Sequence, residues 1–155
     1  MALMSTPAPS RPALRLVVGY DGSPPASRAL DAAVSLLQGR AGRIDVVYVA
    51  YLTSTVMMSA AAVGEMEVDF EEIEKELRTS AAEKLDSSGL EWGFGRRQGP
   101  IAEELITVAN AISEEYPGDT VAIVVGSSSS AVHRMVGSAP VSLARHSPVP
   151  LVVVP

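Results

Sequence analysis

The sequence contains no cysteine and only two histidines, and these absences remove several classes of function. Without cysteine the chain has no disulfide framework, no thiol nucleophile and no cysteine-bound metal site. The two histidines, His133 and His146, are too few for a dedicated zinc site unless carboxylates are placed beside them. We therefore expect no metal ion that is held by protein side chains alone.

Long hydrophobic runs are also missing. No apolar stretch approaches the roughly 20 residues that a transmembrane helix needs. The opening residues, MALMSTPAPSRPA, lack an apolar segment behind a positive end, so they do not resemble a secretory signal. Three prolines among them predict a flexible leader over residues 1–13. We expect a cytoplasmic protein in which residues 14–155 form a single domain, because 47% of the residues are hydrophobic.

Positive charge is scarce, since 12 lysines and arginines face 18 aspartates and glutamates, for a net charge of -6. Nine of the acidic residues and three of the basic ones lie between Glu65 and Asp86, so the rest of the chain is neutral, with nine of each sign. The sequence has no basic stripe of the kind that binds a nucleic-acid backbone. We expect neither a nucleic acid nor a membrane as a partner.

Short apolar runs alternate along the chain with segments of helical periodicity. Glycines at positions 93 and 95 weaken one of the predicted strands, and the stretch from Tyr51 to Gly64 is hard to assign. Strict alternation predicts an α/β fold, a Rossmann-like five-stranded parallel sheet with helices on both faces. The predicted strands are Leu14–Tyr20, Ile44–Ala50, Leu90–Arg97, Val121–Val125 and Leu151–Val154, and the helices between them begin near Pro24, Met66, Pro100 and Pro140.

Ligands of such sheets bind beyond the carboxyl ends of the strands, where the strand order switches. The candidate binding loops are therefore Asp21–Ser23, Val49–Tyr51, Arg96–Gly99 and Gly126–Ser138. For Asp21 two interpretations stay open, a contact to a ligand and an Asx turn ahead of Pro24.

The last of these loops carries the most information. The apolar run Val121–Val125 leads into Gly126 and four serines, Ser127–Ser130, and Gly137 and Ser138 then begin a helical stretch. A glycine turn after a strand, followed by a helix amino terminus, gathers backbone N–H groups that attract phosphate. Ser138 is also a good helix cap. For the serine run, phosphate contact, a polar loop and phosphorylation remain alternatives.

Other nucleotide-binding signatures are absent. The first predicted strand is followed by GYDGSP rather than G-x-G-x-x-G, and no G-x-x-x-x-G-K-[ST] supplies a phosphate-binding lysine. A response-regulator receiver would need an aspartate at the end of the third strand, where Arg96 and Arg97 stand. The common dinucleotide, P-loop and receiver classes are thus excluded.

What remains resembles the universal stress protein family. The matching segments are VVGYDGSPPASRALDAA, VVYVA, VVGSSSS and VGSAPVSLARHSPVPLVVVP, and the likeness extends over about Leu14 to Val154. The resemblance implies the family's fold, which is like that of the adenine nucleotide alpha hydrolases, and a role in the stress response. It also implies a homodimer, because the last strand (151–154) of the family commonly pairs with its copy in a second subunit.

The resemblance further implies an adenine nucleotide site. Nucleotide-binding members carry a glycine, two residues, a second glycine, nine residues, and then glycine with serine or threonine. Gly126 matches the first glycine and Gly137-Ser138 the last pair, whereas Ser129 replaces the middle glycine and only seven residues separate it from Gly137. The site residues implied by the family are Asp21 and Val49 beside the adenosine part, with Val125, Gly126, Ser127, Ser129, Gly137, Ser138 and Ala139 around the phosphate loop.

These observations predict a regulatory protein that binds ATP, with Mg²⁺ brought only by the nucleotide, and that is not an enzyme. The alternative is the same fold with a degenerate loop, which binds no ATP and acts as a dimeric protein-interaction module; Ser129 and the short loop favour it. A nucleotide hydrolase that uses Asp21 or His133 is a third hypothesis, although no base is paired with a nucleophile in the sequence.

Overall fold

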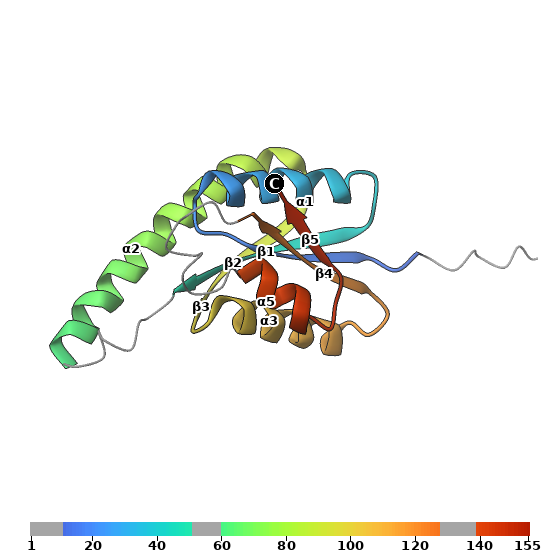
Figure 1. The fold of residues 1–155 in the computed structure, drawn as a ribbon. Helices are drawn as coiled ribbons and strands as arrows, with labels where there is room; N and C mark the ends of the chain where they lie inside the picture. The colour runs from blue at the N-terminus through green and yellow to red at the C-terminus, as the bar shows by residue number, and fades with distance from the viewer. Residues whose placement is uncertain (1–10, 51–59, 128–138) are drawn as a thin grey trace, which may run out of the picture.

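Five parallel strands form one sheet in the order β3-β2-β1-β4-β5. The computed structural model describes residues 11–50, 60–127 and 139–155 (Figure 1). From β1 the chain first adds β2 and β3 on one side and then returns to add β4 and β5 on the other, so the strand order switches between β1 and β4. The strands are β1 (Leu14–Gly19), β2 (Gly42–Ala50), β3 (Glu91–Gln98), β4 (Thr120–Gly126) and β5 (Leu151–Val154).

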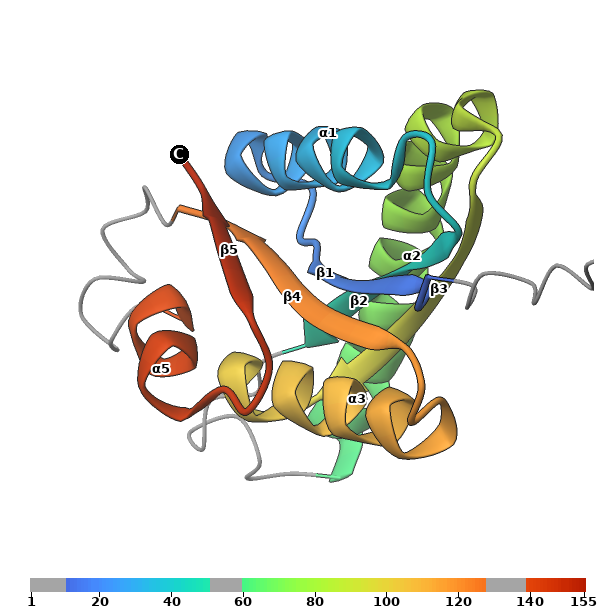
Figure 2. The same ribbon diagram turned by 90° about the vertical axis from the view of Figure 1, so that its right-hand side faces the viewer.

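Helices cover both faces of this sheet. The helices α1 (Pro24–Leu37) and α2 (Ala60–Leu85) pack on one face, and α3 (Ile101–Glu115) and α5 (Ala139–His146) on the other (Figure 2). A short 3-10 turn, Asp86–Ser88, ends α2. The amino-terminal part of α2 extends past the end of the sheet (Figure 1). The predicted α/β fold with a five-stranded parallel sheet is confirmed.

The core divides into two apolar clusters, one on each face of the sheet. Leu16, Val18 and Val124 face α1 and α2, whereas Val17 and Ile123 face α3 and α5. Neighbouring residues of β1 and β4 are therefore buried on opposite faces, which explains why these strands read as continuous apolar runs. Among the residues that the structure describes, no polar or charged residue is buried.

Two segments that the sequence left uncertain are regular in the structure. Helix α2 begins at Ala60, so part of the stretch that was hard to assign is helical. The strand that was predicted to be weak is complete, because all eight residues of β3 pair with β2. The absence of a side chain at Gly93 leaves room for the guanidinium group of Arg43, which a Cβ at this position would displace.

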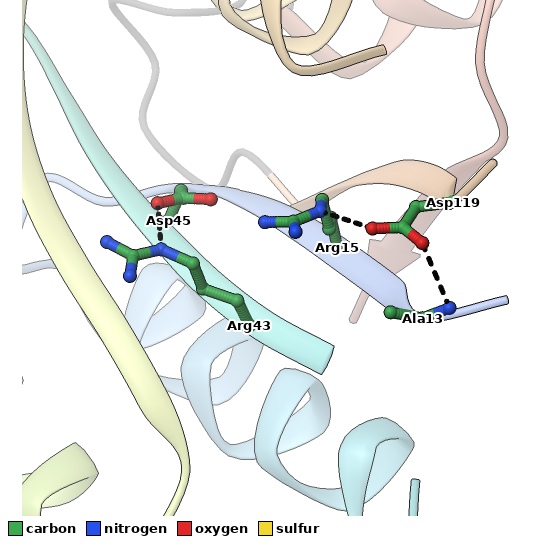
Figure 3. A network of polar contacts seen from close by, with 5 residues as sticks. All are labelled: Ala13, Arg15, Arg43, Asp45 and Asp119. Atoms are coloured by element: carbon green, nitrogen blue, oxygen red, sulfur yellow. Dashed lines mark hydrogen bonds and ion pairs between the residues drawn. The ribbon is translucent and has the colours of Figure 1, made fainter. Parts of the chain in front are cut away.

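A network of polar contacts lies where β1 and β4 begin, at the amino-terminal ends of the strands (Figure 3). Asp119 accepts hydrogen bonds from Arg15 Nε at 2.7 Å and from the backbone N of Ala13 at 3.2 Å. The Arg15 guanidinium also lies 3.4 Å from the centre of the Tyr116 ring. Because Asp119 precedes β4 and Ala13 precedes β1, the network joins the two central strands where they begin. No helix within the described ranges is long and apolar enough to cross a membrane.

Candidate functional site

A cavity of about 140 Å³ opens where the strand order switches, at the carboxyl ends of β1, β2 and β4. The amino-terminal turns of α1, α3 and α5 complete its walls. Most of its lining is apolar, namely Gly19, Pro25, Ala26, Val47, Val49, Ile101, Leu105, Val125, Gly126, Ala139 and Pro140. The polar members of the lining are Tyr20, Asp21, Ser23 and Ser127.

The structure brings together residues that are far apart in the sequence and were predicted to form one site. Those that line the cavity are Asp21, Val49, Val125, Gly126, Ser127 and Ala139. The other predicted site residues, Ser129, Gly137 and Ser138, lie outside the described residues. The shared cavity between the end of β1 and the end of β4 is the geometry that a ligand site at this position requires.

Asp21 forms the Asx turn that was one of its two interpretations, and it also lies at the cavity. It lines the cavity, and its Oδ1 accepts a hydrogen bond of 2.9 Å from the backbone N of Ser23, which forms an Asx turn. Gly22, between them, has a φ of 78°, a conformation that favours glycine. Ser23 then caps α1 by accepting a hydrogen bond of 3.3 Å from the N of Ala26. The turn thus holds the carboxylate at the cavity.

Gly126 has a packing role that the sequence did not reveal. It is the last residue of β4, and its φ is not among the positive values of the described glycines. A Cβ at this position would fall on the carbonyl group of Pro25 and within 2.6 Å of the Pro25 Cβ. Glycine is therefore needed here so that the first turn of α1 can pack against the end of β4, whatever occupies the cavity.

The comparison with protein families decides the identity of this fold. The model of the universal stress protein family matches residues 13–155. The chain belongs to the universal stress protein family. This confirms the resemblance found in the sequence. No curated protein matches the chain.

Solved structures share the fold of this universal stress protein at low sequence identity. Hypothetical protein MJ0577 is 17% identical with a TM-score of 0.72, and the match covers 94% of this chain and 96% of that one. A universal stress protein in complex with cAMP is 21% identical, with coverage of 92% and 97% and a TM-score of 0.59. The Arabidopsis thaliana family protein At3g01520 with AMP bound is 12% identical, with coverage of 91% and 90% and a TM-score of 0.59. At these identities the likeness shows the fold alone.

The charge inside the described part of this cavity is negative. Asp21 is the charged side chain among the described lining residues, which include no lysine, arginine or histidine. Burial raises the pKa of the nearby Tyr48 phenol, and the Asp21 carboxylate raises it further, while Arg96 opposes the shift. The basic loop residues His133 and Arg134 lie outside the described residues. The described walls thus fit an apolar ring with a hydrogen-bonding group at Asp21 better than they fit a phosphate.

No group of three or more potential metal ligands occurs in the part of the chain that the structure describes. Among the described lining residues the donors are the Asp21 carboxylate and serine hydroxyls, a set too small to hold Mg²⁺ as a protein-bound ion.

One of the four candidate loops does not reach the cavity. Residues 96–98 end β3, a strand at one edge of the sheet, and Gly99 follows it; none of the four is among the described lining. Arg97 Nε instead lies 3.0 Å from Glu104 Oε2 on α3. Conversely, Ile101 and Leu105 form a wall of the cavity although the sequence marked them only as the apolar face of a helix. Helical spacing does not distinguish a core residue from a cavity wall.

Proposed function

We propose that this universal stress protein binds an adenine nucleotide in the cavity between β1, β2 and β4 and acts as a regulatory binding protein rather than as an enzyme. The observation that carries the proposal is that Asp21, Val49 and Gly126 line one cavity, although they lie at the carboxyl ends of three different strands. In the resemblance found in the sequence, these are positions of the family's nucleotide site. The similar structures in complex with cAMP and with AMP support this choice of ligand.

The walls of the cavity suit the adenosine part of such a ligand. Val49 from β2 and Ile101 and Leu105 from α3 would pack against the base, because apolar surface favours a flat aromatic ring. The Asp21 carboxylate would accept a hydrogen bond from a sugar hydroxyl. The cavity volume of about 140 Å³ is below the roughly 300–1,000 Å³ of typical ligand sites. The described residues would therefore enclose only part of a nucleotide.

We further propose that the nucleotide is ATP, with Mg²⁺ bound through the phosphates. Gly126 and Ser127 place backbone at the mouth of the cavity, and Ala139 and Pro140 begin α5 beside it. The amino terminus of a helix favours a negative charge. Phosphates that extend from the adenosine pocket would pass this end of α5.

Thermal unfolding with and without nucleotide tests the proposal. AMP, cAMP and Mg²⁺–ATP are each added at about a hundred times the dissociation constant, where specific binding stabilises the folded protein by roughly 2.7 kcal/mol. For a protein of this size the expected rise in Tm is about 5–11 °C. Calorimetric titration provides the dissociation constants.

Asp21→Asn should weaken binding, because the neutral amide accepts a hydrogen bond from a sugar hydroxyl less strongly than a carboxylate does. Asp31→Asn is the matched control, since Asp31 is exposed on α1, pairs with Lys84 at 2.9 Å and does not line the cavity. If none of the three nucleotides shifts the Tm, and none is released when the purified protein is denatured, nucleotide binding is refuted.

That outcome would favour the second candidate, a dimeric protein-interaction module. The absence of a basic side chain from the described cavity lining speaks for it, together with serine at position 129. Both candidates include a homodimer formed through β5. This strand is at the edge of the sheet, pairs with β4 on one side, and exposes 43% of Val153. An edge strand presents unpaired backbone groups to a second strand, and light scattering after gel filtration measures whether two chains associate.

A further inference from the structure

The residue that precedes Asp21 connects the cavity to α2. Tyr20 follows β1 directly, is only 4% exposed, and donates a backbone hydrogen bond of 2.9 Å to the carbonyl of Val47. Its ring belongs to the apolar cluster that faces α1 and α2. The Tyr20 hydroxyl shares a hydrogen bond of 2.8 Å with the hydroxyl of Ser80 on α2. A buried phenol needs such a partner, and here the partner comes from α2, which contributes no residue to the described lining of the cavity.

The residue that follows Asp21 is also in contact with α2. Gly22 adopts a φ of 78°, and a Cβ at this position would lie 2.7 Å from Leu77 Cδ2. Leu77 is buried and is one helical turn from Ser80. Both neighbours of Asp21 thus lie close to α2, Tyr20 through a hydrogen bond and Gly22 through the close approach of Leu77, while Asp21 itself is exposed and lines the cavity.

We propose that Tyr20 and Ser80 are positioning residues for the Asp21 carboxylate, so that α2 orients the proposed nucleotide site without contributing to the described cavity lining. The inference rests on the proposed function. A side chain contributes its full binding energy only when the residues around it hold it in the geometry that the ligand needs. The Asx turn fixes the Asp21 side chain relative to Ser23, and the contacts to α2 fix the turn relative to the sheet.

The test is the affinity of the full chain for AMP, measured by calorimetric titration. Tyr20→Phe and Ser80→Ala each remove one hydroxyl of the shared hydrogen bond, and each should weaken AMP binding by about 2- to 10-fold. The double variant should bind no more weakly than the single ones, since both remove the same interaction. Ser87→Ala is the matched control, because the exposed Ser87 hydroxyl donates to Lys84 O at 3.3 Å, away from the loop. It should bind AMP like the wild type.

A background of Asp21→Asn distinguishes positioning from a general loss of structure. If Tyr20 acts through the carboxylate, Tyr20→Phe should lose its effect on AMP affinity when Asp21 is already replaced. Hydrogen exchange gives a readout without ligand: the Ser23 amide, which donates to Asp21, should exchange faster in Tyr20→Phe and Ser80→Ala but not in Ser87→Ala.

The outcomes separate this inference from the proposed function. If the wild type binds AMP and Tyr20→Phe and Ser80→Ala bind it equally well, positioning by α2 is refuted while nucleotide binding stands. A loss of affinity that persists unchanged in the Asp21→Asn background also refutes it, because the effect then bypasses the carboxylate. If the wild type binds neither AMP, cAMP nor ATP, the proposed function fails, and this inference fails with it.

Discussion

Replacing Gly126 by alanine should destabilise the protein by about 1–3 kcal/mol, the usual cost of forcing an extra group into a well-packed region. The added Cβ would overlap the carbonyl group of Pro25 and approach its Cβ to 2.6 Å. Pro25 lies in the first turn of α1, so its backbone cannot move aside as a flexible side chain would. Either α1 or the end of β4 must shift.

Urea unfolding monitored by circular dichroism measures this cost as a lower midpoint at an unchanged slope. In a thermal scan the same loss lowers the Tm by roughly 2–12 °C, at about 2–4 °C per kcal/mol. The loss should appear without any nucleotide, because the contact that causes it lies between two parts of the chain.

Gly95→Ala is the matched control. Gly95 is also a strand glycine, lacks a positive φ, and has no atom within 4 Å of the position that a Cβ would occupy. This substitution should leave stability unchanged or raise it by up to about 1 kcal/mol, since glycine weakens a strand interior. If Gly126→Ala were as stable as the wild type and lost only ligand binding, the packing argument would be wrong, and glycine would be needed for the ligand's approach.

Three further outcomes follow from the contacts described above. Asp119→Ala should cost about 1–3 kcal/mol in urea unfolding, because it leaves Arg15 and the Ala13 N–H without their acceptor; a cost under about 0.5 kcal/mol would contradict this. Burial, and then the Asp21 carboxylate, raise the pKa of Tyr48 above 10 in the folded protein. The contribution of Tyr48 to the free energy of unfolding is therefore complete below pH 10 and is lost as the pH rises through the folded pKa. The Tm should therefore fall less steeply above pH 10 in Tyr48→Phe than in the wild type, and equal slopes would argue against it. Val153→Lys should convert the proposed dimer to a monomer, as measured by light scattering. If the wild type is already a monomer at micromolar concentration, the dimer through β5 is refuted.

Most of the fold could be predicted because its signals are local. The run Val121–Val125 is apolar on both faces, and Ser23 with Pro24 marks a helix start, so β4 and α1 followed from spacing and capping. The start of α2 at Ala60 could not be predicted because Gly64, a poor helix former, interrupts the segment ahead of the periodic residues from Met66, although the alanines at 60–62 favour a helix. The full length of β3 could not be predicted either, because the glycine at 93 that weakens the strand also makes room for Arg43 from β2, a contact between distant residues.

The candidate site was predictable only in part, for a similar reason. Asp21 and Gly126 could be placed near each other because the ends of parallel strands converge at the switch of strand order. The wall from Ile101 and Leu105 and the support from Ser80 depend on how α3 and α2 pack, which no periodicity specifies. The sequence connected Gly126 with a phosphate loop. The structure shows that Gly126 also packs closely against Pro25, which is about a hundred residues away and could not be predicted from the residues around Gly126.

The position of β1 between β2 and β4 has a consequence for how the chain folds during its synthesis. β1 pairs with β2 soon after both emerge, but its other edge waits for Thr120–Gly126, in the last third of the chain. Until then this edge of β1, a strand that is buried on both faces, is open to misassembly, as unpaired edges are in general. A nascent chain that stalls before residue 120 would therefore leave that edge exposed. Completion of β4 would pair the edge, and the cavity would form only once α5 has followed.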